Sequence, residues 1–298
     1  MTTATVRHIE HMELPPRISE FRRFLRVFLS RKVVIFGSII ILALLLIAIF
    51  APLIAPHNPT QQNLWETLQE SSGKHLFGTD HLGRDVLSRI IYGSRISLAV
   101  GIVSVGIAGC FGMFLGLLAG YFGGIVDTVI MRCIDALLAI PPLVLALAIG
   151  AALGGGLGSV MISLGIALLP TYARLIRGQV LSVKQTDYIM AARVVGCSDL
   201  RIIMMHVFPN CLPPIIVLVT LNLGFAILAE AGLSFLGLGI APPAAAWGAM
   251  VNDGYKYLLT NPILSFAPGL CIFLVVLAFN LVGDGLRDAL DPRLRGTI

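Results

Sequence analysis

Residues 33–55 read VVIFGSIIILALLLIAIFAPLIA, a run of 23 residues without a charged side chain. About 20 consecutive apolar residues are enough for a helix to cross the hydrocarbon core of a bilayer. The run is longer than the roughly 7–15 residues of a cleaved signal peptide's apolar region. We therefore predict a retained anchor helix over residues 33–55, preceded by a basic N-terminal arm at residues 1–32.

The composition of the whole chain is that of a membrane protein. Hydrophobic residues make up 57% of the 298 residues, charged residues only 12%, and the mean hydropathy is +0.90. Soluble globular proteins average about 25% charged residues. The composition therefore excludes a soluble domain, a disordered chain and a nucleic-acid-binding protein. The five cysteines are scattered, which argues against a disulfide framework or a cysteine metal site.

Five further apolar stretches follow the anchor. The first, residues 96–126, is rich in glycine and ends at the turn 121–124; small residues let helices approach closely in lipid. The others lie at about residues 125–150, 159–181, 212–236 and 262–283. Pro141 and Pro142 predict a kink inside the 125–150 stretch. The expected fold is thus an all-α polytopic membrane protein with six transmembrane helices.

Six spans place both ends of the chain on one side of the membrane. Sixteen of the 21 Lys and Arg residues fall on that side, and five fall on the other. The positive-inside rule assigns the richer side to the cytoplasm. We therefore predict cytoplasmic termini, with a cytoplasmic tail at residues 286–298, and an outer loop at residues 56–94. In that loop, Asp80, Gly83, Arg84 and Asp85 are expected to cap and anchor a short helix over residues 86–94.

The loop after the fourth span predicts a helical elbow on the cytoplasmic side. Residues 184–210 read KQTDYIMAARVVGCSDLRIIMMHVFPN. Asp187 is expected to cap a helix that ends at Gly196, because glycine suits the left-handed position after a helix. A second short helix, residues 200–207, is expected to end before Pro209. Ala191 and Ala192 offer a flat surface against which another backbone can pack.

The elbow resembles the E-A-A-x3-G-x9-I-x-L-P signature of the permease subunits of binding-protein-dependent ABC importers. Ala191, Ala192, Gly196 and Pro209 occupy matching positions, whereas Met190 stands at the position of the family's Glu. Four other segments resemble the C-type permeases of the dipeptide, oligopeptide and nickel subfamily: HLFGTDHLGRD (75–85), YFGG (121–124), SFLGLG (234–239) and FNLVGDGLRDALDP (279–292).

The resemblance implies a type I ABC importer permease fold in the bacterial cytoplasmic (inner) membrane. The anchor would precede a five-helix core at residues 95–285 that contains the elbow, residues 184–209. The implied partners are a second homologous permease subunit (a heterodimer), two ABC ATPase subunits and a periplasmic or lipid-anchored binding protein. The implied contact with an ATPase uses Asp187, Ala191, Ala192, Arg193, Gly196 and Pro209.

The chain is expected to be a transporter subunit and not an enzyme. It has no G-x4-G-K-[ST] phosphate-binding loop, so ATP and Mg²⁺ would bind the ATPase subunits and this chain would bind no cofactor. Glu230 lies inside the fifth apolar run, where a charge is expensive and usually faces the bundle interior or water. We expect Glu230 and Asn222 to line the translocation path; a structural pairing of Glu230 with Lys256 is the alternative.

Peptides, either di- or oligopeptides, are the expected substrates. Nickel or a metal chelate is the alternative within the same class, because the subfamily shares these motifs. His75 and His81 are candidate ligands, but we expect a solvated loop and predict no metal-binding and no catalytic residues. A self-sufficient secondary carrier is the alternative from a different class. It lacks the inverted repeat of many carriers and leaves the elbow unexplained.

Overall fold

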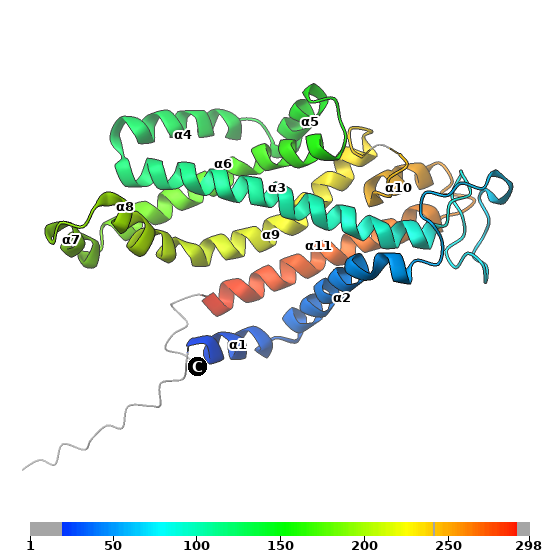
Figure 1. The fold of residues 1–298 in the computed structure, drawn as a ribbon, viewed down its shortest axis with the longest axis horizontal. Coiled ribbons are helices and arrows are strands. Elements are labelled where there is room, and N and C mark those ends of the chain that lie inside the picture. Colours follow the sequence, from blue (N-terminus) through cyan, green and yellow to red (C-terminus); the bar gives the residue numbers. More distant parts are fainter. Residues whose placement is uncertain (1–19, 241, 291–298) are drawn as a thin grey trace, which may run out of the picture.

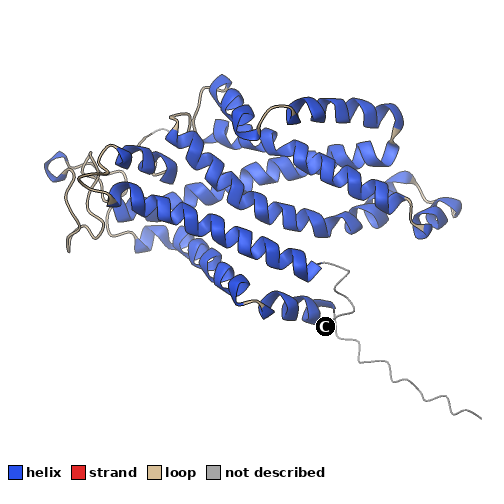
Figure 2. Cartoon of the chain, turned by 180° about the vertical axis from the view of Figure 1, so that it is seen from behind, coloured by secondary structure: helices blue, strands red, loops and turns tan. Residues whose placement is uncertain are grey.

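The computed structural model describes residues 20–240 and 242–290. Within these residues every regular element is a helix, and an isolated bridge pairs Thr79 with Asp85 (Figure 2). Helices satisfy their own backbone N–H and C=O groups, which a bilayer core requires. Parts of the predicted N-terminal arm and tail, residues 1–19 and 291–298, lie outside the described residues.

Five long helices form a bundle, and each is long and apolar enough to cross a membrane. They are α2 (Lys32–Ile54), α3 (Val86–Phe122), α6 (Leu157–Lys184), α9 (Phe208–Phe235) and α11 (Ile263–Leu290). The shorter elements are α1 (Glu20–Ser30), η1 (Leu64–Glu66), α4 (Gly124–Leu138), α5 (Pro142–Ala152), α7 (Asp187–Val194), α8 (Asp199–Ile202), the π-helical turn η2 (Ile203–Val207) and α10 (Trp247–Tyr255). Figure 1 shows α1, α7, α8 and the last turn of α11 toward one end of the bundle, and α10 toward the other.

The stretch predicted as a third span forms two helices. α4 and α5 meet at an angle of 91°. Pro141 and Pro142 lie at the junction, and Pro142 is the first residue of α5. Proline has no N–H to donate and clashes with the preceding turn, so the pair favours a break between α4 and α5. The break lies where we predicted a kink, but the two helices meet nearly at a right angle. Five of the six expected spans are thus single long helices, and the sixth corresponds to this bent pair.

The first core helix is longer than predicted. α3 begins at Val86, so the short helix expected at residues 86–94 is its first part, and the core starts before residue 95. The Asp85 side chain accepts a hydrogen bond from the Ser88 N–H at 2.8 Å and caps this start. The helix continues through Gly93, which packs against the indole of Trp247: a Cβ there would lie 2.5 Å from the ring. At the other end of the chain, α11 continues to Leu290, beyond the predicted core boundary.

A glycine seam joins α3 to α6. Gly112, Gly116 and Gly120 are spaced by four residues and therefore share one face of α3. A Cβ at these positions would lie 2.6 Å from Tyr172 Cβ, 2.5 Å from the Ala173 carbonyl oxygen and 2.8 Å from Val180 Cβ, respectively. The two backbones are thus in direct contact, as small residues allow in membrane helices.

This seam predicts the effect of adding a side chain to it. Gly116→Val places two methyl groups against the α6 backbone, and overpacking of this kind costs about 1–3 kcal/mol. We expect a lower thermal unfolding temperature for the detergent-purified variant. Gly106→Val is the matched control, because Gly106 lies on the same helix with nothing within 4 Å of its Cβ position. Equal losses in both variants would mean that helix propensity, and not the seam, sets the stability.

Candidate functional site

The elbow, residues 184–209, contains two short helices that meet at Gly196. The N–H groups of Gly196 and Cys197 donate to the carbonyls of Arg193 and Ala192, both at 3.0 Å. Gly196 has a φ of +84°, the left-handed conformation that ends many helices in this hydrogen-bond pattern. The structure confirms that Gly196 terminates the first elbow helix.

Two details of the elbow differ from the prediction. Thr186 precedes α7 at the cap position, and Asp187 is its first helical residue, where its negative charge still suits the helix N-terminus. Pro209 does not end the second helix: α8 continues through η2 into α9. Pro209 directly follows the π-helical turn η2, where the ordinary α-helical hydrogen-bond ladder is already interrupted, so the helix continues through it. The second elbow helix is therefore the beginning of a membrane-spanning helix.

The elbow presents apolar side chains to solvent. Val194 and Val195 are 88% and 82% exposed, whereas Ile189 on the opposite side of α7 is fully buried. Ala191 is also exposed and Ala192 is half-buried. Contiguous exposed apolar residues mark surfaces that bind another protein or a membrane. We call the set of exposed apolar side chains the elbow face; its large members are Tyr188, Met190, Val194, Val195, Leu200, Met204 and Met205.

Tyr121, near the end of α3, holds the elbow to the bundle. Its hydroxyl donates to Asp199 Oδ1 at 2.5 Å, and its carbonyl accepts a hydrogen bond from Lys184 Nζ. The Arg193 guanidinium lies 5.6 Å from the centre of the Tyr121 ring, at the range of a cation–π contact. Side chains of α6, α7 and α8 thus meet one buried tyrosine. The sequence offered the YFGG segment as a signal, but it did not reveal this role.

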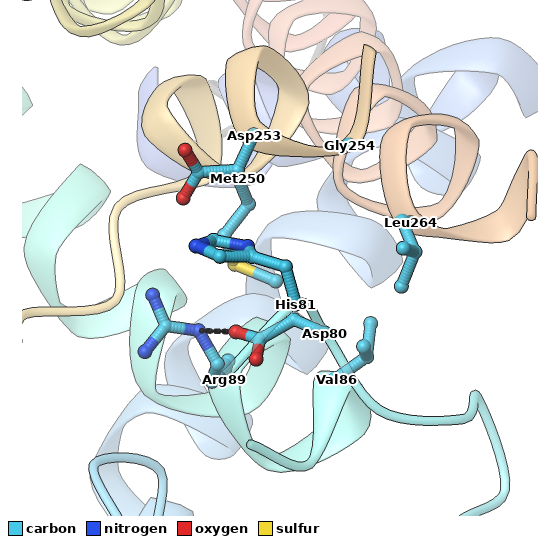
Figure 3. Close-up of a pocket in the computed structure, with 8 residues that line it drawn as sticks. All are labelled: Asp80, His81, Val86, Arg89, Met250, Asp253, Gly254 and Leu264. Atoms are coloured by element: carbon cyan, nitrogen blue, oxygen red, sulfur yellow. Dashed lines mark ion pairs between the residues drawn. The ribbon is translucent and has the colours of Figure 1, made fainter. Parts of the chain in front are cut away.

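The loop between α2 and α3 is built around buried charges (Figure 3). Asp80 Oδ2 accepts a hydrogen bond from Arg84 Nε at 2.6 Å and lies 3.6 Å from Arg89 Nε. An Arg89 nitrogen also donates to the Pro59 carbonyl at 3.1 Å and the Pro243 carbonyl at 3.3 Å. A buried ion needs such partners to offset its lost hydration. The segment 75–85 therefore fastens the loop to the start of α3.

The structure separates the two histidines of this loop. His81 stacks on Tyr257, with 6.3 Å between ring centres, in the space where α3, α10 and α11 meet (Figure 3). His75 is only 4% exposed and lies against His57 and Asp85 instead. The expectation of a solvated loop is wrong for His75. Its side chain is buried, and its hydrogen bond to Asp85 offsets the loss of hydration.

Glu230 is fully buried inside the bundle. Its Oε1 accepts a hydrogen bond from Ser234 Oγ at 2.6 Å, while Oε2 has no partner among the described residues. The predicted alternative, an ion pair of Glu230 with Lys256, is not present among the described residues. Asn222 Nδ2 is likewise buried without a hydrogen-bond partner there. Further buried polar atoms without a hydrogen-bond partner in the described part of the chain include the hydroxyl oxygens of Ser97 and Ser104 in α3 and of Tyr172 in α6.

A hollow of about 520 Å³ lies between α6, α9 and α11. Its polar lining comes from Gln179, Asn210 and Arg287, and Pro213 and Pro214 line it from α9. Glu230 and Asn222 are not among its lining residues, so the hollow and the predicted path residues are separate features of this conformation. The sequence analysis did not single out the hollow, since its three polar residues are far apart along the chain.

The sequence matches two known families. Residues 112–296 match the family described as binding-protein-dependent transport system inner membrane component. The chain belongs to this family. Residues 19–69 of the permease also match the N-terminal TM domain of oligopeptide transport permease C. The family resemblance is thereby confirmed, and the matched residues include the elbow and three of the four other segments.

Relatives of the permease align with nearly their full length. It is 45% identical over 278 residues to the dipeptide transport system permease protein DppC of Alkalihalophilus pseudofirmus, covering 93% of this chain and 91% of the relative. It is 44% identical over 276 residues to the glutathione transport system permease protein GsiD of Pectobacterium atrosepticum, covering 92% of each. It is 45% identical over 260 residues to the probable D,D-dipeptide transport system permease protein DdpC of Escherichia coli, covering 87% of each.

A solved structure supports the expected fold. The inward-facing MetNI methionine ABC transporter matches with a TM-score of 0.56 at 20% identity, over 69% of the permease and 97% of that chain. The permease thus has the type I ABC importer permease fold. Family membership overturns the self-sufficient carrier. The nickel alternative has no support from these relatives, which are named for dipeptides, glutathione and D,D-dipeptides.

The Tyr121 contact predicts how firmly the elbow is held. Tyr121→Phe removes the hydroxyl that bonds the Asp199 carboxylate, and a hydrogen bond to a charged group contributes about 1.5–3 kcal/mol. We expect amide hydrogen exchange in α7 and α8 to become about tenfold faster or more, with exchange in α3 and α6 unchanged. Tyr92→Phe, near the other end of the same helix, is the control. Unchanged elbow exchange in Tyr121→Phe would show that the hydroxyl does not hold the elbow.

Proposed function

We propose that the permease forms half of the translocation path of an ABC importer for di- or oligopeptides and receives ATPase motion through its elbow. The observation that carries this proposal is the elbow face, an exposed apolar surface on a helix pair that continues directly into α9. A surface of this kind suits a groove on a partner protein. The proposed assembly contains a second homologous permease, two ABC ATPase subunits and a periplasmic or lipid-anchored binding protein.

The elbow has two routes by which a push can reach the bundle. One is the unbroken path from α8 through η2 into α9. The other is Tyr121, which joins α3 to Asp199 and Arg193. The first route starts at α8 and the second at Arg193 and Asp199, which lie in the same two short helices as the elbow face. A partner that moves the elbow would therefore tilt α3 and α9 together instead of bending a flexible loop.

The proposed coupling residues have different parts in this scheme. Ala191 belongs to the elbow face and Gly196 is exposed beside it, whereas Ala192 is half-buried toward the cluster that includes Ile189. Arg193 lies over Tyr121. Asp187 and Pro209 mark the first turns of α7 and α9. We infer that the partner contacts the first group and that the others hold the elbow in shape.

The orientation of the chain follows from its charges. α1, the elbow and the end of α11 lie toward the same end of the bundle, and Arg31 pairs with Asp288 at 2.7 Å. This end corresponds to the side that holds most of the Lys and Arg residues. We therefore propose that it faces the cytoplasm, where the ATPase subunits would bind ATP and Mg²⁺. The loop between α2 and α3 would then face the binding protein.

A charge on the elbow face tests the coupling role. Val194→Glu replaces an 88% exposed side chain, so the fold should be unaffected, but docking would desolvate an unpaired carboxylate. We expect at least a tenfold loss of peptide uptake and of co-purifying ATPase. Leu259→Glu, at a fully exposed position in the loop between α10 and α11, should leave the co-purifying ATPase unchanged. An unimpaired Val194→Glu variant would rule out docking at this face.

The path role of Glu230 and Asn222 remains a proposal that the buried, incompletely bonded Glu230 carboxyl supports. Polar groups without partners inside a membrane bundle are costly and often belong to substrate pathways. Glu230→Gln keeps the shape and an oxygen that can accept the bond from Ser234, and it replaces the carboxyl group by an amide. We expect normal assembly and a several-fold change in uptake of cationic relative to neutral peptides. Identical uptake of all peptides tested would contradict a path role.

A further inference from the structure

Three side chains of the loop between α2 and α3 converge on one point. They are His57, just after α2, His75 in the middle of the loop, and Asp85 at the start of α3. His75 Nδ1 lies 2.8 Å from Asp85 Oδ1, and His57 Nδ1 lies 3.7 Å from the same oxygen. The two imidazole rings are 4.6 Å apart, centre to centre. The possible ligand atoms all lie within 4.8 Å of one another.

Two side chains of the cluster are buried, and some of its nitrogen atoms make no hydrogen bond to the part of the chain that the structure describes. The His75 and Asp85 side chains are 5% and 1% exposed. His57 Nδ1 and His75 Nε2 are shielded from solvent and make no hydrogen bond within the described residues. Buried polar atoms of native proteins nearly always have a partner, and one that lacks it points to an unseen water or ion. Of these two atoms, His57 Nδ1 faces Asp85 Oδ1, whereas His75 Nε2 lies on the Glu66 side of its ring.

Neighbouring groups hold the cluster in place. Asp85 Oδ2 accepts hydrogen bonds from Ser88 N–H at 2.8 Å and Ser88 Oγ at 2.7 Å, which leaves Oδ1 for the histidines. Ser88 Oγ also accepts the His57 N–H at 3.0 Å. Glu66 Oε2 lies 3.6 Å from His75 Nε2. A carboxylate behind a ligating histidine is the usual outer partner in metal sites, where it orients the ring.

We propose that His57, His75 and Asp85 bind a resident divalent transition metal ion, for which Zn²⁺ is the best fit. Imidazole nitrogen and carboxylate oxygen are zinc ligands at about 2.0–2.2 Å. Tetrahedral geometry at those lengths separates two ligand atoms by roughly 3.3 Å, a value between the two distances to Asp85 Oδ1. For His75 to bind the ion through Nδ1, its ring proton must lie on Nε2, which faces Glu66 Oε2, so the hydrogen bond between His75 and Asp85 is exchanged for a bond from each of them to the ion. A cavity of about 160 Å³ beside the cluster leaves room for water as a fourth ligand.

The position of the site indicates a structural ion and not a transported one. The ligands come from the loop and from the residue that caps α3, outside the interior of the bundle. An ion there would cross-link the end of α2, the middle of the loop and the start of α3. It would therefore stiffen the surface that faces away from the elbow, independently of which substrate the importer carries.

Zinc titration of the full-length permease tests the site. The detergent-purified chain is treated with N-ethylmaleimide to block its accessible thiols, stripped with EDTA and titrated with ZnCl₂ against a fluorescent zinc chelator. We expect about one bound ion per chain and a higher unfolding temperature when zinc is present. His57→Ala should weaken binding at least tenfold, and Glu66→Gln, which changes the outer partner, about tenfold.

His57→Ala is suited to this test because the His57 side chain is 34% exposed and its backbone bond to Ser88 survives the substitution. An unchanged unfolding temperature in EDTA would show that this variant is folded; His57→Gln is the substitute if it is not. His81→Ala, in the same loop but outside the cluster, should bind zinc as the unaltered chain does. Absence of binding to the unaltered chain, or equal affinity after either His57 substitution, would overturn the proposal.

Discussion

The direct backbone contact of α3 with α6 is the constraint on which the rest of the fold depends. Glycines on one face of α3 bring the two helices together, and the ends of α3 then position both specialised regions of the chain. At one end, Tyr121 attaches the elbow. At the other, Asp85 caps the helix and anchors the long loop. A change in the α3–α6 distance would displace both the elbow and the loop anchor, because a close-packed interface transmits displacement.

Local chemistry explains which features could be read from the sequence. The end of α7 was predictable because a glycine after a helix-forming stretch is a signal carried by one residue, Gly196, and the positive φ of Gly196 confirms it. The long apolar runs were predictable because spanning a bilayer needs length and hydrophobicity alone. The family signature of the elbow was similarly compact. These predictions share one property: none required knowledge of what lies across the bundle.

The features that escaped prediction depend on contacts between distant residues. His57 and His75 are brought together by the loop path, so their meeting with Asp85 leaves no local pattern, and the sequence predicted no metal site. The burial of Arg84 and Arg89 depends on carbonyls and a carboxylate supplied by the fold. Pro209 shows the limit of a local rule: it was expected to end a helix, but it follows the π turn η2, where the α-helical hydrogen-bond ladder is already interrupted, and the helix continues.

The π-helical turn η2 also fixes the direction in which the elbow points. A π turn holds one more residue than an α turn, and each residue of a helix turns the chain by about 100°. The N–H of Phe208 accordingly donates to the carbonyl of Ile203, five residues earlier. The widened turn sets how far α8 is rotated about the helix axis relative to α9. It thereby sets the direction in which the elbow face points. Membrane helix and docking surface are therefore held in register by a single extra residue.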